Sequence, residues 1–86
     1  MDKKFKIKSE VIIERLENSW ILLNIKDGKF YELNDSAKFI VDILKEEPTF
    51  KEIEKKVAKS FSNSSFEDID SFLKELLKLG FMEIYE

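Results

Sequence analysis

Residues 19–33 read SWILLNIKDGKFYEL, two short apolar runs separated by a polar segment that contains Asp27 and Gly28. An Asp-Gly pair between apolar runs is typical of a β-hairpin, because a type I′ turn needs a positive φ at both central residues. With this pair at the tip of the turn, Ile25 lies opposite Phe30. The stretch therefore predicts a hairpin of two antiparallel strands.

Both faces of this predicted hairpin are apolar. One face carries Trp20, Leu22, Tyr31 and Leu33, and the other carries Ile21, Leu23, Ile25 and Phe30. A small sheet that helices cover on one side should alternate apolar and polar residues more cleanly. We therefore expect a terminal segment or a partner to cover part of the second face.

The rest of the chain predicts one more strand before the hairpin, at 5–16, and three helices after it. Each helix begins at a side chain that can cap it, namely Asn34, Thr49 with Glu52, and Ser64 with Glu67. Pro48 ends the first helix, and Gly80 ends the third in a left-handed conformation. Residues 81–85 alternate and predict a short terminal strand.

Three strands, three helices and a terminal strand within 86 residues predict one α+β domain over residues 1–86. The order favours a winged-helix-like arrangement, in which an N-terminal three-stranded antiparallel sheet precedes the helices. A two-layer α+β unit with different packing is the alternative.

Composition argues against catalysis and against a bound metal or cofactor. The chain has no cysteine and no histidine, so it lacks the usual nucleophile pairs and zinc ligands. Its two glycines are too few for a phosphate-binding loop. Acidic pairs such as Glu46-Glu47 lie where helices begin or end, which favours a capping role over acid–base chemistry. We therefore expect no catalytic residue, no metal site and no cofactor.

Charge argues against nucleic acid and membranes as partners. The net charge is −3, and Arg15 is the only arginine. The predicted third helix is acidic, since Glu67, Asp68, Asp70 and Glu75 outnumber Lys74 and Lys78. An acidic surface repels phosphate, and no apolar run approaches the roughly 18 residues that a membrane span needs. These features predict a soluble cytoplasmic protein.

The predicted third helix has an unusually wide apolar face. Its apolar residues are Phe66, Ile69, Phe72, Leu73, Leu76, Leu77 and Leu79. They cover an arc of roughly 160°, against about 100° for an ordinary surface helix. Either a small domain packs this helix deeply, or the margin at Phe72 and Leu79 lines a groove. The periodicity favours the first interpretation over the second.

Two stretches carry a family resemblance. ILLNIKDGKFYELNDSAKFIVDIL at 21–44 and FEDIDSFLKELLKLGFM at 66–82 resemble the PqqD-like family, and the similarity extends over about residues 10–84. This family contains the recognition elements of ribosomally made, post-translationally modified peptides. One departure is Glu46-Glu47-Pro48, where the family often has Asp-Gly.

The resemblance implies a non-catalytic domain that binds the leader region of a precursor peptide. The leader would add as a strand beside residues 29–33 and against the third helix. The implied contacts are Lys29, Phe30, Tyr31, Glu32, Leu33, Asp68, Ile69, Phe72, Glu75 and Leu76. The implied partners are the precursor and a maturation enzyme, such as a radical SAM enzyme or the leader peptidase and cyclase of a lasso-peptide pathway. A winged-helix nucleic-acid-binding or transcriptional accessory protein and a partner in redox-cofactor biosynthesis are the alternatives.

Overall fold

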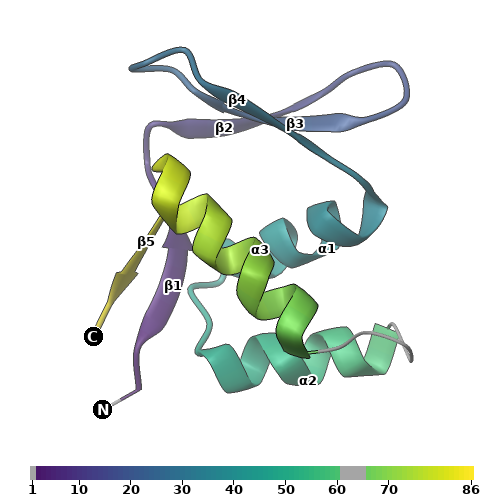
Figure 1. Cartoon of the computed structure of the whole chain (residues 1–86), viewed down its shortest axis with the longest axis vertical. Helices are drawn as coiled ribbons and strands as arrows, with labels where there is room; N and C mark the ends of the chain where they lie inside the picture. Colours follow the sequence, from purple (N-terminus) through teal and green to yellow (C-terminus); the bar gives the residue numbers. More distant parts are fainter. Residues whose placement is uncertain (1, 61–65) are drawn as a thin grey trace.

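Two small antiparallel sheets and three helices make up the part of the chain that the computed structural model describes, residues 2–60 and 66–86 (Figure 1). In chain order the elements are β1 (Lys4–Ile7), β2 (Val11–Arg15), β3 (Trp20–Asn24), β4 (Phe30–Leu33), α1 (Asp35–Leu44), α2 (Phe50–Ser60), α3 (Phe66–Leu79) and β5 (Met82–Tyr85). The larger sheet has the order β2-β3-β4, and the smaller one pairs β1 with β5. The predicted α+β class, with its three-stranded sheet, three helices and terminal strand, is confirmed.

The predicted hairpin forms, but its predicted register is wrong by two residues. Leu23, and not Ile25, lies opposite Phe30. A shift of two residues leaves every side chain on the face it was assigned, because side chains alternate with a period of two. The inner face of the hairpin is therefore the one expected from the sequence.

The side chain of Asn24 explains this register. Its Oδ1 accepts hydrogen bonds from the backbone N–H groups of Lys26, at 2.9 Å, and Asp27, at 3.3 Å. Gly28 has a positive φ of 77°, whereas Asp27 is not among the described residues with a positive φ. A two-residue type I′ turn would need both. Asn24, only 5% exposed, thus organises a longer loop in its place.

The single strand predicted over 5–16 is also wrong, because the segment divides into β1 and β2. The backbone N–H of Val11 bonds to the carbonyl of Lys8 at 3.0 Å, which closes a turn between them. β1 lies outside the larger sheet and pairs with β5, so that Lys4 lies opposite Tyr85. A partner more than seventy residues away leaves no local signal in the sequence.

The helix starts agree with the sequence where the structure describes them. The Asn34 side chain accepts the N–H of Ala37 at 2.8 Å and caps α1. Thr49 and Glu52 cap α2 reciprocally, through bonds of 2.8 and 3.3 Å. The capping box predicted to begin at Ser64 lies outside the described residues.

Gly80 ends α3 as predicted and sends the chain back into the core. Its φ is 86°, and its N–H bonds to the Leu77 carbonyl at 3.2 Å. The next N–H, that of Phe81, bonds to the Leu76 carbonyl at 2.9 Å. This pair of bonds is a Schellman motif, in which the residue after the glycine contacts the last turn of the helix. Phe81 is consequently 1% exposed.

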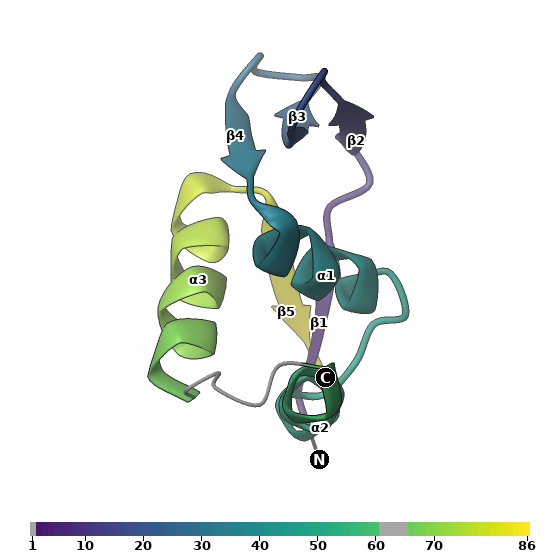
Figure 2. The ribbon, with the colours of Figure 1, turned by 90° about the vertical axis from the view of Figure 1, so that its right-hand side faces the viewer.

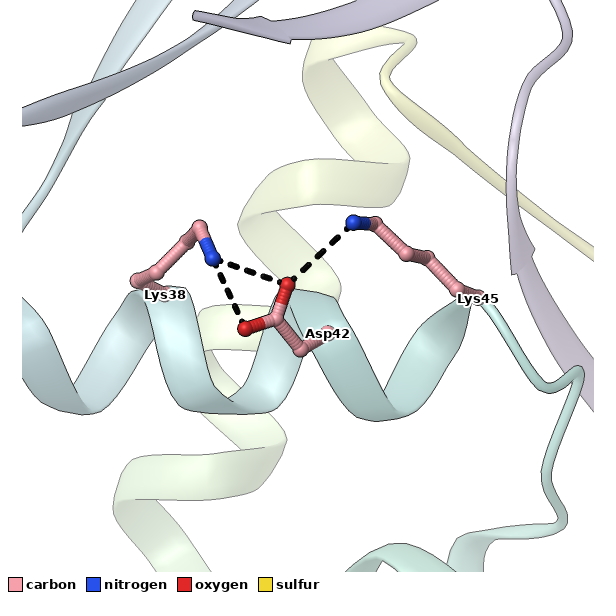
Figure 3. A network of polar contacts seen from close by, with 3 residues as sticks. All are labelled: Lys38, Asp42 and Lys45. Carbon is pink, nitrogen blue, oxygen red and sulfur yellow. Dashed lines mark hydrogen bonds and ion pairs between the residues drawn. The ribbon is translucent and has the colours of Figure 1, made fainter. Parts of the chain in front are cut away.

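The core lies between the larger sheet and the helices, which Figure 2 shows on one side of that sheet. Lys38 of α1 helps to hold the hairpin against this core through a cation–π contact. The Lys38 Nζ lies 4.1 Å from the centre of the Trp20 ring of β3. The same Nζ pairs with Asp42 at 2.7 Å, and Lys45 lies 3.4 Å from that carboxylate (Figure 3). Trp20 packs against the core, as its place in the strand pattern suggests.

The outer face of the larger sheet, which points away from the helices, is not covered by any described segment of the chain. Phe30 is 69% exposed and Ile25 is 63% exposed. The N-terminal residues, which were one candidate cover, pair with β5 instead. A terminal segment therefore does not cover this face within the described residues.

We expect Glu47→Gly to raise the free energy of unfolding by about 0.5–1 kcal/mol, because glycine adopts a positive φ without steric cost. Glu47 has a φ of 53°, the one positive value among the described residues other than glycine. It stands where the PqqD-like pattern often has glycine. Urea denaturation measures the change. Glu46→Gly is the matched control and should lower stability, so a gain in both variants would contradict the argument.

Candidate functional site

β4 is an edge strand with an open side. It is the last strand in the order β2-β3-β4. The N–H of Asn24 bonds to the Lys29 carbonyl at 2.9 Å, so Lys29 faces β3. In an antiparallel ladder, alternate residues bond to the neighbouring strand. The backbone N–H and C=O groups of Phe30 and Glu32 therefore point outward, and within residues 2–60 and 66–86 no strand pairs with them.

α3 lies beside this open edge. Figure 2 shows β4 above the C-terminal turns of α3. The rings of Tyr31 and Phe72 are 6.2 Å apart between centroids and tilted by 57°. Both residues are half-buried, so each keeps part of its ring accessible. The two rings join the strand to the helix and form the apolar floor of the edge.

Glu75 adds a carboxylate to this floor. Burial, then the charge of Glu75, then a hydrogen bond to that carboxylate raise the pKa of the Tyr31 phenol above its usual value near 10. The hydroxyl is therefore protonated at neutral pH and donates to Glu75. Because Glu75 is exposed, it also presents negative charge beside the strand edge.

Phe81 supports the site from below, a role that the sequence analysis missed. Its ring lies 6.2 Å from that of Tyr31, at 66°, an edge-to-face arrangement. The Schellman motif at Gly80 places Phe81 there. The aromatic residue directly after Gly80 was the available signal, but its contact with Tyr31 depends on how α3 meets the sheet.

The structure separates the expected contact residues into surface and core. Tyr31, Phe72 and Glu75 meet at the edge, and Lys29, Phe30 and Glu32 are exposed beside it. Leu33, Ile69 and Leu76 are between 0 and 3% exposed and belong to the core. The Asp68 side chain lies outside the described part. The wide apolar arc of α3 thus serves two purposes, since Ile69 and Leu76 are core whereas Phe72 and Leu79 form a half-buried margin.

The described residues of the site offer groups suited to binding. Among the described residues, no three His, Cys, Asp or Glu side chains gather closely enough to hold a metal ion. In the same part of the chain, no helix has the length and apolar character to cross a membrane. The edge presents free backbone groups, two aromatic rings and a carboxylate, which suit an extended segment of chain.

The Tyr31–Glu75 contact predicts a pH dependence. Since folding raises the pKa of Tyr31, the contact contributes stability below about pH 10, and that contribution disappears as the pH rises through the raised pKa. In a Tyr85→Phe background, where Tyr31 is the remaining tyrosine, absorbance at alkaline pH follows its phenol alone. Glu75→Gln should shift the titration downward. An unchanged titration would show that Glu75 does not act on the phenol.

Comparisons with known proteins agree with this fold. The chain matches the family model of coenzyme PQQ synthesis protein D (PqqD) over residues 19–82. A solved lasso peptide synthetase B1 complexed with the leader peptide is 20% identical, with a TM-score of 0.73 over 92% of this chain and 96% of that chain. TbiB1 in complex with the TbiA(beta) leader peptide is 22% identical, with a TM-score of 0.78 over 91% and 94%.

At these identities the likeness to the two solved structures establishes a shared fold. No curated protein matches the chain significantly. The family model spans most of the chain, from the start of the hairpin through β3, β4 and all of α3 to the first residue of β5. The resemblance noted in the sequence is therefore confirmed, and the chain belongs to the PqqD family.

Proposed function

We propose that this protein binds the leader region of a ribosomally made precursor peptide and holds it for a maturation enzyme. The leader adds as a strand along the open edge of β4, with its side chains against α3. The observation that carries the proposal is an edge strand whose free backbone groups lie beside the paired rings of Tyr31 and Phe72.

The backbone of β4 supplies the recognition that does not depend on side chains. The outward N–H and C=O groups of Phe30 and Glu32 match the spacing of an added strand. Lys29 and Leu33, which flank them, bond toward β3 and hold β4 in place. Leader side chains then alternate between the α3 side and the outer side.

The α3 side supplies the selectivity. Tyr31 and Phe72 give an accessible aromatic surface, and Glu75 gives a carboxylate that accepts a hydrogen bond. Ile69 and Leu76 hold this surface from beneath, since both are buried. Asp68, one turn before Phe72, is the fifth expected contact of α3. Aromatic and aliphatic anchors of this kind dominate the energy of small interfaces.

The fold likeness to two proteins solved with leader peptides supports the same occupant. The chain itself performs no chemistry in this proposal, because it lacks cysteine and histidine. A radical SAM enzyme, or a leader peptidase and cyclase, would modify the peptide that it holds. A nucleic-acid ligand has less support, since Glu32 and Glu75 are exposed beside the edge and would repel phosphate.

A proline substitution tests strand addition. Glu32→Pro removes an outward N–H without breaking the β3–β4 ladder, because proline is tolerated on an edge whose N–H faces solvent. We expect it to weaken leader binding about tenfold or more, since one backbone bond is lost and the ring blocks the strand. Fluorescence anisotropy with a labelled leader peptide of a cognate precursor measures the effect.

Arg15→Pro is the matched control. Arg15 lies opposite Trp20 in the β2–β3 ladder, and its N–H also points away from the sheet, but on the β2 side. This variant should bind the leader like the parent. Equal losses in both variants would point to general damage to the sheet. A loss in Arg15→Pro alone would show that the leader binds at the β2 edge, and would contradict the proposal.

A further inference from the structure

The outer face of the larger sheet has two rows of side chains that run across all three strands. One row is entirely apolar, since Ile12 lies opposite Leu23 and Leu23 lies opposite Phe30. Directly opposed residues in a sheet project to the same face, so these three side chains form one stripe.

The adjacent row on this face is acidic at both ends. Glu14 lies opposite Ile21, and Ile21 lies opposite Glu32. Both glutamates are exposed, and neither row contains a lysine or an arginine. The face therefore combines an apolar stripe with a negative border.

The apolar stripe is accessible. Phe30 is 69% exposed and Ile12 is 38% exposed, while Leu23 is half-buried between them. Ile25, 63% exposed, follows Leu23 two positions later in the chain and adds apolar surface beside the stripe. A contiguous apolar surface of this kind, bordered by polar residues, usually marks an interaction site.

The charge of the border selects among occupants. A second copy of this chain would bring the glutamates of two molecules, each with a net charge of −3, close together. An anionic lipid surface would be repelled for the same reason. A protein surface that is apolar and bordered by Lys or Arg is complementary to both rows.

We propose that the outer face of the β2–β3–β4 sheet is the docking surface for such a basic protein, the enzyme that acts on the bound peptide. This inference rests on the proposed function. A strand added to β4 would continue both rows, because its alternate side chains would project to the same outer face. The enzyme would then contact the protein and the outward side chains of the leader on one continuous surface.

The absence of cysteine in this chain allows the contact to be mapped. A single Phe30→Cys protein is labelled with benzophenone maleimide, mixed with an extract of the source cells and the leader peptide, and irradiated. Mass spectrometry identifies the crosslinked peptide. A Lys55→Cys protein, labelled on the exposed side of α2, is the control for nonspecific capture. The expected product is one peptide-modifying enzyme, joined through a segment that contains Lys or Arg.

Two changes on β2, far from the leader edge, then test the chemistry of the face. Each is added to the labelled protein. Ile12→Lys should lower the crosslink yield about tenfold, because it removes an apolar anchor of the stripe. Glu14→Lys should lower the yield several-fold, because it reverses a charge of the acidic border. Glu54→Lys on α2 makes the same charge change elsewhere and should leave the yield unchanged. All three proteins should bind the leader like the parent.

The outcomes separate this inference from the function on which it rests. The docking surface is wrong if the label crosslinks a second copy of this chain or a lipid, even when leader binding is normal. It is also wrong if neither Ile12→Lys nor Glu14→Lys lowers the crosslink yield. Failure of the parent to bind the leader would contradict the proposed function. In that case, a crosslink to a basic protein surface whose yield falls in Glu14→Lys would still support the docking surface.

Discussion

Phe81→Ala is expected to lower the free energy of unfolding by about 3–5 kcal/mol, the cost of emptying the space of a fully buried phenylalanine. Phe81 is 1% exposed and joins the last turn of α3 to Tyr31. A chain of 86 residues has a total stability of roughly 4–13 kcal/mol, so this one change removes a large share of it. Urea denaturation followed by circular dichroism measures the loss.

Phe30→Ala is the matched control for this prediction. It removes the same atoms from a residue that is 69% exposed, so stability should change by less than about 0.5 kcal/mol. Phe81→Leu keeps most of the buried volume and provides a folded variant if Phe81→Ala is unfolded. Equal losses at positions 30 and 81 would contradict the assignment of Phe81 to the core.

Phe72→Ala is expected to weaken leader binding tenfold to a hundredfold, which corresponds to about 1–3 kcal/mol. Phe72 provides the accessible ring on α3 that faces the β4 edge through Tyr31. Without this ring, the leader loses its main apolar contact but keeps the backbone of β4. Anisotropy titration with the leader peptide measures the affinity.

The stability of Phe72→Ala must be measured first, because Phe72 also packs against the core. Circular dichroism should show a folded protein before its affinity is interpreted. Lys56→Ala on α2 should bind normally, and so should Leu77→Ala, which removes a 43% exposed side chain elsewhere on α3. If folded Phe72→Ala binds like the parent while Lys56→Ala loses binding, the groove is misplaced.

Local signals predicted the helices and the faces of the hairpin. Asn34, Thr49 and Gly80 act at helix ends through bonds to residues at most four positions away, so the sequence contains both partners of each bond. The hairpin faces were also correct, because they depend on alternation and not on the turn. What failed was the turn itself, where the side chain of Asn24 outweighed the preference of Asp27 and Gly28.

Contacts between distant segments could not be predicted in this way. The 5–16 segment is rich in isoleucine and valine and partly alternates, so it reads as one strand. Its division depends on β5 being present to pair with β1. The same limit applied to the site. Ile69, Phe72 and Leu76 share one apolar arc, and only the packing of α3 shows that Ile69 and Leu76 are core whereas Phe72 reaches the edge.

The pairing of β1 with β5 has a practical consequence for handling this protein. Because Lys4 lies opposite Tyr85, both ends of the described chain emerge at one corner, away from the β2–β3–β4 sheet (Figure 1). Neighbouring ends of this kind allow a domain to be inserted into a loop of a host protein. A carrier, a surface tether or such a host could therefore hold the protein by that corner and leave the β4 edge free.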